Sequence, residues 1–458
     1  MFSCICAIMS QAQTWNWFAG EHQIHRSRCS IGLAADQSLH HGSGNDWFYV
    51  YNTADCGNFL HFKPVGRRMS NILFAWELGR NLGHIARDLP VALALRARGH
   101  QVYFASRNLH QAQAILMPEG FACFQAPRLL QQRQTIIPST YAEILLANGY
   151  NETGSLNALV AAWQRMARDL KTDVVVCNHA PTAVLAMRCA DIPTVATCIG
   201  FEMPPASPQV FRTWDPPPEG RAAAAEQCAS QMISQTLEKR GRGPVESVAE
   251  LFSSASVLMT TFPELDHYGP RPGLNYIGPI ARLPGRRREW PTGVRKRVFA
   301  YLRNTVPNIA AILSGLAATP AEVFCVMPDL APADITERQT PNLLLQRETV
   351  DIWSILPLCD LVVTYGTGTV HDALLAGRPL LLCPQNAEQY LMSLQVVRLG
   401  AGLMLPVDAS PAAISETVSI LLSEMSFSDA AQAFSEKYAT YSMAATVQKT
   451  VDEVESRL

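Results

Sequence analysis

Short apolar runs alternate with segments of helical spacing along most of the chain from Met69 onward. Runs of four to six apolar, often β-branched residues have the length of buried strands, whereas apolar residues repeated every three or four positions indicate helices. Strands are predicted near Ile72, Val102, Phe121, Val174, Thr194 and Val257, and again at residues 298–301, 323–327, 343–346, 361–363 and 380–383. Alternating strands and helices predict an α/β fold with parallel sheets.

A segment rich in Pro and Gly, Tyr268 to Pro291, separates the two series of predicted strands and is expected to be a connector. We therefore expect a first Rossmann-like domain with its connector at residues 69–290 and a second at 291–458. Helices are predicted after Pro411 and near Ala430, and the last of them is expected to pack back onto the first domain.

Residues 1–68 lack this periodicity and contain Trp15, Trp17 and Trp47. We interpret them as an N-terminal extension outside the native start, translated because an earlier Met is used. A genuine extension that folds on the surface is the alternative.

The segment Leu361 to Gly377 predicts a strand, a glycine turn and a helix. Gly366 and Gly368 allow a ligand to approach the backbone, and Thr369 is expected to cap the helix. The start of a helix offers free N–H groups and a positive dipole end to an anion such as phosphate. The spacing matches neither the P-loop nor the dinucleotide fingerprint, which disfavours ATP and NAD. An ordinary strand–turn–helix without a ligand is the alternative.

The first predicted strand leads into a glycine-bearing loop, Gly79 to His84, and then into a helix with an apolar stripe. Imidazole titrates near neutral pH, so His84 is suited to act as a general base that deprotonates an attacking hydroxyl. Its place at a helix N-terminus should lower its pKa and favour the neutral form. A hydrogen bond from His84 to a loop carbonyl, without a catalytic role, is the alternative.

The order of these segments resembles the donor-binding signature of the UDP-glycosyltransferase superfamily, in particular bacterial macrolide-glycosyltransferase-like members. Residues 364–369 stand where that family has His-Gly-Gly-x-Gly-Thr, and Glu388-Gln389 stand where it has an acidic residue and Gln that contact the sugar. The resemblance covers about 370 residues of the part that begins at Met69 and implies the GT-B architecture, two facing Rossmann-like domains with parallel sheets and an interdomain cleft. It implies donor contacts from Gly83, Arg303, Val350, Thr364, Gly366, Thr367, Gly368, Thr369, Glu388 and Gln389, with Arg303 on phosphate or, alternatively, simply at the surface.

Three positions depart from the family pattern. Thr364 replaces a phosphate-contacting His, and a hydroxyl can donate a hydrogen bond but carries no charge. Tyr365 replaces a small residue. Asn178 replaces the Asp expected behind the base, so it can hold the imidazole but cannot stabilise the imidazolium by charge. Asp173 begins the same strand and lies too far away to substitute, and His179 is either an alternative base or a packing residue.

Together these features predict an inverting, metal-independent glycosyltransferase that moves a sugar from a nucleotide-activated donor, expected to be UDP-linked, to an acceptor hydroxyl. His84 is the base with Asn178 behind it, and a helix dipole with backbone N–H groups neutralises the leaving group, so neither a cofactor nor a metal is expected. A non-catalytic nucleotide-sugar-binding accessory protein is the alternative, motivated by Thr364 and Asn178. An NAD(P)-dependent oxidoreductase is weaker, because the first loop lacks the dinucleotide fingerprint.

Composition narrows the class of partner. The chain has 458 residues with 37 basic and 39 acidic side chains, a net charge of −2, so a nucleic-acid partner is not expected. No apolar run reaches the roughly 18 residues that cross a bilayer. The acceptor is expected to be a small molecule or a lipid, and a lipid would draw the protein to a membrane surface. Twelve scattered cysteines without metal-ligand spacing, and no convincing signal peptide, favour the reducing cytoplasm.

Overall fold

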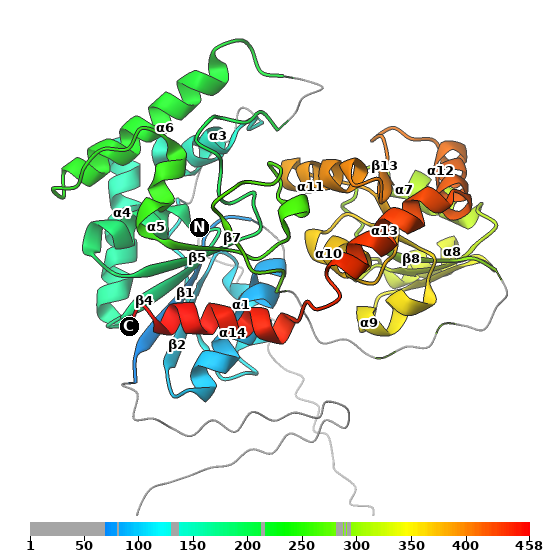
Figure 1. The fold of residues 1–458 in the computed structure, drawn as a ribbon, viewed down its shortest axis with the longest axis horizontal. Coiled ribbons are helices and arrows are strands. Elements are labelled where there is room, and N and C mark those ends of the chain that lie inside the picture. The colour runs from blue at the N-terminus through cyan, green and yellow to red at the C-terminus, as the bar shows by residue number, and fades with distance from the viewer. Residues whose placement is uncertain are drawn as a thin grey trace, which may run out of the picture. The chain divides into compact units, whose positions relative to one another are not determined.

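The computed structural model describes residues 69–79, 82–129, 137–211, 216–280, 287, 290 and 295–458. The interpretation of residues 1–68 as an extension lies outside the described residues. The described chain forms two parallel sheets covered by helices (Figure 1). The predicted α/β fold with two Rossmann-like domains is confirmed.

The first sheet has seven strands in the order β3-β2-β1-β4-β5-β6-β7, and all neighbouring strands are parallel. Its strands are β1 (Asn71–Trp76), β2 (Gln101–Ser106), β3 (Ala122–Gln125), β4 (Val174–Asn178), β5 (Thr194–Cys198), β6 (Ser256–Met259) and β7 (Asn275–Tyr276). Its helices are α1 (Gly83–Ala97), α2 (Leu109–Leu116), α3 (Tyr141–Leu145), α4 (Thr153–Asp169), α5 (Pro181–Ala190) and α6 (Arg221–Glu238), with tighter or wider turns at Leu146–Tyr150, Val248–Ser254 and Pro263–Leu265.

The second sheet has six parallel strands in the order β10-β9-β8-β11-β12-β13. Its strands are β8 (Arg297–Tyr301), β9 (Glu322–Val326), β10 (Leu343–Gln346), β11 (Leu361–Thr364), β12 (Leu380–Leu382) and β13 (Gly402–Met404). The helices that follow are α7 (Ile309–Ala317), α8 (Pro332–Arg338), α9 (Ile352–Ile355), α10 (Thr367–Leu375), α11 (Ala387–Arg398), α12 (Pro411–Ser423), α13 (Met425–Lys437) and α14 (Met443–Glu455), with a short turn at Leu356–Leu358.

Both sheets are buried on their two faces, which explains why their strands are apolar runs without alternation. In β1, Ile72 and Phe74 pack with α1 and α14, whereas Leu73 and Ala75 pack with the core under α4, α5 and α6. Alternate residues of one strand thus enter opposite cores, as the pleat requires. The second sheet is arranged in the same way, with α7 and α12 on one face and α10, α11 and α13 on the other.

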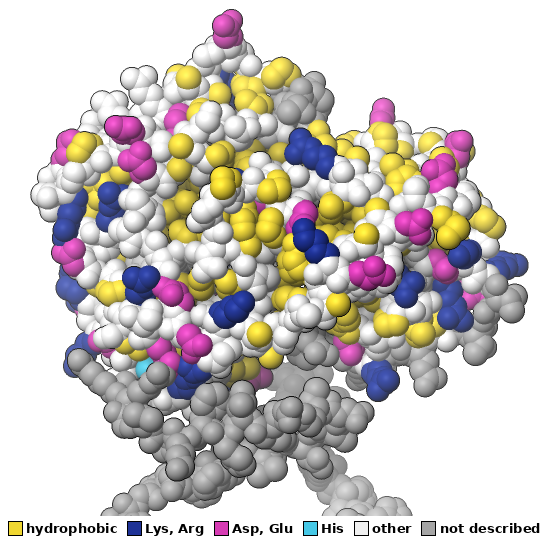
Figure 2. Space-filling view, viewed as in Figure 1, with side chains coloured by type: hydrophobic (Ala, Val, Ile, Leu, Met, Phe, Trp, Pro, Cys, Tyr) yellow, Lys and Arg dark blue, Asp and Glu magenta, His cyan; other side chains and the backbone are white. Residues whose placement is uncertain are grey.

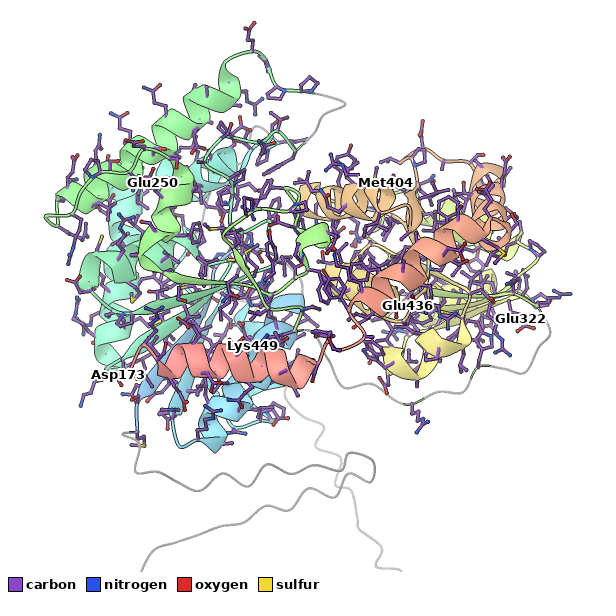
Figure 3. All side chains as sticks on the ribbon, viewed as in Figure 1. Asp173, Glu250, Glu322, Met404, Glu436 and Lys449 are labelled. Carbon is purple, nitrogen blue, oxygen red and sulfur yellow. The ribbon has the colours of Figure 1, made fainter. Side chains whose placement is uncertain are left out.

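The last helix, α14, returns to the first sheet, as predicted. Its Val451 and Val454 are fully buried in the same core as Ile85 of α1. At its C-terminal end Glu455 accepts from the His100 ring at 3.2 Å. Figure 1 shows α14 beside α1 and β2, and Lys449 marks the helix in Figure 3.

The predicted connector contains one element that the sequence did not indicate. Asn275–Tyr276 form β7, which pairs with β6 through Leu258 and Met259 and extends the first sheet. Two residues are too few to show a period of any kind, so this strand gave no signal in the sequence.

The surface agrees with the balanced composition. On the face drawn in Figure 2, the coloured Lys and Arg side chains are interspersed with Asp and Glu rather than gathered in a patch of one sign. No helix of the described residues is both long and apolar enough to cross a membrane.

Candidate active site

The two loops predicted to carry the chemistry both lie where the strand order of a sheet reverses. In the first sheet β1 and β4 are neighbours, with Trp76 opposite Asn178 at their carboxyl ends, and the helix bearing His84 follows β1. In the second sheet β8 and β11 are neighbours, with Tyr301 opposite Thr364. Open α/β sheets bind ligands beyond the carboxyl ends of the strands at such reversal points.

The His84 imidazole is held by Asn178 in a single tautomer. Nδ1 of His84 lies 2.7 Å from Oδ1 of Asn178. The same oxygen accepts a hydrogen bond from Arg87, and Nδ2 of Asn178 donates to the His84 carbonyl oxygen at 3.0 Å. Because an arginine can only donate and a carbonyl can only accept, these contacts fix the orientation of the amide. Nδ1 of His84 therefore carries the proton, and Nε2 keeps the lone pair that a base needs.

Gly79 provides the space around Nε2. Its φ is +86°, a backbone conformation that favours glycine, and a Cβ at this position would lie 2.2 Å from Nε2 of His84. The indole of Trp76 stacks on the imidazole with ring centroids 5.1 Å apart. Stacking on Trp76 holds one face of the imidazole, and the absence of a side chain at Gly79 leaves room at its Nε2 edge.

Charged groups surround this histidine. Arg87 forms a buried ion pair with Glu202 at 2.9 Å. Although burial opposes it, the Arg87 guanidinium lowers the pKa of Glu202 to about 2. Burial, reinforced by Arg87, lowers the pKa of His84 to about 4. The direction of the His84 shift is the one expected, but its main cause is desolvation rather than the helix N-terminus.

A buried carboxyl group, Asp88, completes the cluster. Its Oδ1 accepts from Nδ2 of Asn178 at 2.8 Å, and burial raises its pKa to about 7. The sequence reasoning missed Arg87, Asp88 and Glu202. Asp88 stands four residues after His84, a spacing that places both on one face of a helix and could have revealed it. Glu202 comes from the loop after β5 and carries no comparable signal.

His179, the alternative base, lies next to the same site in a different setting. Its ring is 6.0 Å from that of His84 and 6.0 Å from that of Tyr141, centroid to centroid. It is 8% exposed, and burial lowers its pKa to about 3. Its Nε2 has no hydrogen-bond partner among the described residues, and the same holds for the Tyr141 hydroxyl.

Asp173 is confirmed to lie at the far end of β4. Its carboxylate accepts from the Asn71 amide at 2.7 Å, at the start of β1, and it is labelled in Figure 3. It takes no part in the His84 cluster.

On the second sheet, the predicted glycine turn leads into α10, but the predicted cap is wrong. The helix begins at Thr367 with Gly366 at its N-cap and no side-chain cap, so Thr369 lies inside the first turn. The first backbone bond of the helix runs from Val370 N–H to the Gly366 carbonyl at 3.1 Å. The N–H groups of Thr367, Gly368 and Thr369 therefore lack intrahelical acceptors.

The space beside this turn is open. A Cβ added at Gly366 would meet no atom within 4 Å, and its φ of −100° does not itself require glycine. The glycine here leaves room next to free N–H groups rather than permitting an unusual backbone conformation.

The replacements Thr364 and Tyr365 are both engaged by the protein. Thr364 is fully buried, and its hydroxyl oxygen accepts from the Gly366 N–H at 3.3 Å. Tyr365 stacks against Tyr301 and accepts a hydrogen bond from the Arg303 guanidinium, while burial raises the pKa of Tyr365 to about 12. Nε of Arg303 has no hydrogen-bond partner, and no carboxylate of the described residues forms an ion pair with Arg303. The guanidinium of Arg303 therefore lies beside the Gly366 turn as a positive charge that no carboxylate of the described residues neutralises.

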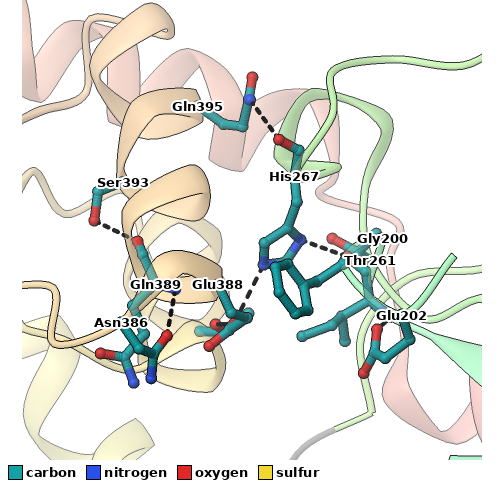
Figure 4. Close-up of polar contacts among 12 residues, drawn as sticks. Gly200, Glu202, Thr261, His267, Asn386, Glu388, Gln389, Ser393 and Gln395 are labelled. Carbon is teal, nitrogen blue, oxygen red and sulfur yellow. Dashed lines mark hydrogen bonds and ion pairs between the residues drawn. The ribbon is translucent and has the colours of Figure 1, made fainter. Parts of the chain in front are cut away.

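The acidic residue and Gln of the resemblance lie at the start of α11. Glu388 accepts from the Thr367 hydroxyl and lies 3.2 Å from Nε2 of His267, which belongs to the loop following β6 (Figure 4). Gln389 is 2% exposed, and its Oε1 accepts from the Gln385 N–H at 2.9 Å.

The remaining predicted donor contacts lie apart from these side-chain networks. Val350 lies between β10 and α9 and is half-buried against the apolar core that contains Phe299 and Val362. Gly83 is exposed and is the first residue of α1. Among the described residues, no three His, Cys, Asp or Glu side chains converge in a group able to hold a metal ion.

Similarity to known proteins agrees with this arrangement. A family model described as the C-terminal domain of erythromycin biosynthesis protein CIII-like proteins matches residues 310–454. The chain is 24% identical over 412 residues to a PGL/p-HBAD biosynthesis glycosyltransferase of Mycobacterium tuberculosis, covering 82% of this chain and 90% of that relative.

Solved structures share the fold. The calicheamicin glycosyltransferase is 21% identical with a TM-score of 0.64, covering 86% of this chain and 99% of its own. A spinosyn rhamnosyltransferase complexed with thymidine diphosphate is 17% identical with a TM-score of 0.60, covering 84% and 100%. The two Rossmann-like sheets and these solved structures show the GT-B fold, and the family-model match and the named relative support a glycosyltransferase similar to the UDP-glycosyltransferase superfamily.

Proposed function

We propose that the protein transfers a sugar from a nucleoside-diphosphate donor to an acceptor hydroxyl, with inversion at the anomeric carbon and without a metal ion. The observation that carries this proposal is the His84 imidazole, whose Nδ1 proton is held by Asn178 while Nε2 faces the space left by Gly79. This is the tautomer and the orientation that a general base requires.

The acceptor half of the reaction follows from that geometry. Nε2 of His84 takes the proton of the acceptor hydroxyl while its oxygen attacks the anomeric carbon from the face opposite the diphosphate. The bond between the anomeric carbon and the diphosphate oxygen breaks, its electron pair leaves with the diphosphate, and the proton remains on His84. Attack from the opposite face inverts the configuration.

The donor half is assigned to the loops after β8 and β11. The free N–H groups at the start of α10 and the guanidinium of Arg303 face a diphosphate and neutralise the charge that develops on it. Arg303 thereby supplies the positive charge that Thr364 cannot. Glu388 and Gln389 are assigned to the sugar hydroxyls, and the backbone at Val350 to the base.

The donor nucleotide is assigned as UDP from the sequence resemblance, with thymidine diphosphate as the competing candidate because a spinosyn rhamnosyltransferase of the same fold was crystallised with it. The acceptor is assigned as the hydroxyl of a small molecule or a lipid, in the cytoplasm or at the adjoining membrane surface. The named relative is a PGL/p-HBAD biosynthesis glycosyltransferase, so compounds of that biosynthesis are a practical starting set of acceptors.

A two-step experiment tests the proposal. Thermal unfolding is measured with UDP-, TDP- and GDP-sugars, because a ligand at a hundred times its Kd stabilises the native state by about 2.7 kcal/mol. The donor that binds is then incubated with a panel of acceptors, and glycosylated product is measured by mass spectrometry for the parent and for His84→Ala. Loss of product in His84→Ala by roughly a hundredfold or more, with donor binding retained, is the expected result.

Two outcomes would contradict the proposal. Product formation in His84→Ala within about threefold of the parent would remove His84 from the base role. If the parent binds the donor but neither transfers the sugar to any acceptor nor hydrolyses the donor, the non-catalytic accessory protein is favoured.

A further inference from the structure

Asn178 stands between His84 and a second acidic residue. Its amide oxygen accepts from Nδ1 of His84 at 2.7 Å, and its amide nitrogen donates to Oδ1 of Asp88 at 2.8 Å. His84 and Asp88 are one turn apart on the same face of α1, so β4 inserts the amide between two groups of a single helix. The carboxylate missing at position 178 is therefore present one hydrogen bond further away.

Among the charged side chains that contact Asn178 or Arg87, Asp88 has no ion-pair partner among the described residues. Arg87 is neutralised by Glu202, since the two form a buried ion pair at 2.9 Å. Asp88 is 3% exposed and forms no ion pair with any described residue. The other charged or titratable groups that face the cluster are Cys177 of β4, His179 from the loop after β4 and Glu388 from α11.

From this geometry we propose that Asp88 supplies, through the amide of Asn178, the negative charge that stabilises the His84 imidazolium during transfer. The proposal rests on the function proposed above, with His84 as base. Asp88 is a positioning residue, because it touches neither substrate nor the reacting nitrogen.

The physical basis is polarisation along a chain of hydrogen bonds. An ionised Asp88 pulls on the N–H of the Asn178 amide, which makes the amide oxygen more negative toward the Nδ1–H of His84. When Nε2 gains the acceptor proton, the positive charge of the ring is met by this oxygen and by the carboxylate behind it. No proton moves along the amide, since Nδ1 keeps its hydrogen throughout.

The position of Asp88 changes the expected effect of the substitution Asn178→Asp. In Asn178→Asp alone, the new carboxylate would lie at hydrogen-bond distance from Asp88, where the amide nitrogen now lies at 2.8 Å. Two carboxyls so close share a proton and hold one net charge between them. We therefore expect Asn178→Asp to need Asp88→Asn as well before it improves proton abstraction.

The test compares Asp88→Asn, Asp88→Asn/Asn178→Asp and the parent. Asp88→Asn keeps an oxygen that can accept from Asn178 and removes only the charge, so kcat should fall roughly tenfold with KM unchanged. The rise of kcat with pH as the Asp88 carboxyl ionises should also disappear. The double variant returns the charge to the residue that contacts His84, and kcat should recover to within about threefold of the parent.

The second readout does not depend on transfer. The pKa of His84, followed by NMR of the imidazole nitrogens, should fall by roughly half a unit to one unit in Asp88→Asn and rise above the parent value in the double variant. An unchanged His84 pKa and a kcat within twofold of the parent in Asp88→Asn would overturn the proposal. If the parent shows no transfer but the His84 pKa responds as expected, the proposed function fails while the coupling of Asp88 to His84 stands.

Discussion

The two reversal points of this molecule are equipped differently. Around His84 the side chains of Arg87, Asp88, Asn178 and Glu202 are buried and bonded to one another, so that their polar atoms determine one arrangement of the imidazole. Beside β11, by contrast, the backbone N–H groups that begin α10 lack intrahelical acceptors, and Arg303 has no carboxylate partner among the described residues and an Nε without a hydrogen bond.

The contrast follows from what each point is proposed to do. A base must present one nitrogen in one tautomer, which requires fixed side-chain neighbours. A diphosphate is charged and has many acceptor oxygens, so hydrogen-bond donors without a protein acceptor are sufficient to bind it. Stability should therefore respond to substitutions around His84, and donor affinity to substitutions around Arg303.

The largest effect is expected from breaking the buried ion pair. Arg87→Met removes the cation and leaves Glu202 buried without its partner, which should lower the free energy of unfolding by about 3 to 5 kcal/mol, measured by urea denaturation. Arg87→Met/Glu202→Leu is the matched control, because it removes both charges and should recover most of the loss. A single variant as stable as the parent would show that the His84 region is not organised by this pair.

A pH effect on stability is expected next in size. Glu77, at the end of β1, is buried and accepts from the Thr182 and Ala183 amides at 2.9 and 3.3 Å, and burial raises its pKa to about 7. Burial raises the pKa of Asp88 to about 7 as well. Both carboxyls hold a proton more tightly in the folded than in the unfolded protein.

The sign of the pH dependence follows. The stability that these two groups contribute is fully present below about pH 4 and is lost as the pH rises through about 7, by about 3 to 4 kcal/mol for each. Glu202 acts in the opposite sense, because its pKa of about 2 makes its contribution disappear only below pH 4.5. Because burial lowers the pKa of His84 and of His179, these two groups add stability as the pH rises toward 6.5, so the carboxyl effect is measured as a difference between proteins. From pH 5 to 8 the denaturation midpoint of the parent should fall relative to that of Glu77→Gln, whose amide does not ionise. A difference between the two midpoints that does not change with pH would show that Glu77 is not protonated when buried.

The sequence predicted the framework well because both sheets are made of apolar runs that helices separate. Every strand from β1 to β6 and from β8 to β12 falls at or beside a predicted run, since burial on both faces of the central strands favours apolar residues over most of their length. β7 was missed because it is two residues long. The start of α10 was misplaced by three residues because Thr369 has the right chemistry for a cap but Gly366 takes that position.

The chemistry was predicted only as far as single loops allow. His84 and Asn178 could be paired from the order of the strands, and the structure places them 2.7 Å apart. Glu202 could not be found, because its contact with Arg87 joins segments 115 residues apart in the chain. Arg303 could be named but not interpreted, since its lack of an anionic partner is a property of the folded protein.

Donor affinity should respond to Arg303 more than to any neighbour on its loop. Arg303→Leu removes charge-assisted hydrogen bonds to the proposed diphosphate and should weaken donor binding by roughly 1.5 to 3 kcal/mol, measured by calorimetry. Arg303→Lys keeps the charge and should lose less. Because Arg303 has no ion pair to break and Arg303→Leu removes only its hydrogen bond to Tyr365, the unfolding free energy of both variants should stay within about 1 kcal/mol of the parent. If the donor affinity of Arg303→Leu equals that of the parent, Arg303 does not bind the diphosphate, and the phosphate site lies elsewhere.

The smallest effect distinguishes two threonines in the first turn of α10. The hydroxyl of Thr367 donates to Glu388, whereas the hydroxyl of Thr369 makes no hydrogen bond with the described residues. Thr367→Val leaves Glu388 with one fewer donor and should destabilise the protein by about 0.5 to 1.5 kcal/mol, while Thr369→Val should leave unfolding unchanged. If Glu388 also binds the donor sugar, Thr367→Val should change the preference among sugars of one nucleotide, because the carboxylate then turns away from its present position. If Thr367→Val and Thr369→Val have the same unfolding free energy and the same sugar preference, neither hydroxyl contributes, and the turn binds the donor through its backbone N–H groups alone. The site around His84, by contrast, depends on side chains.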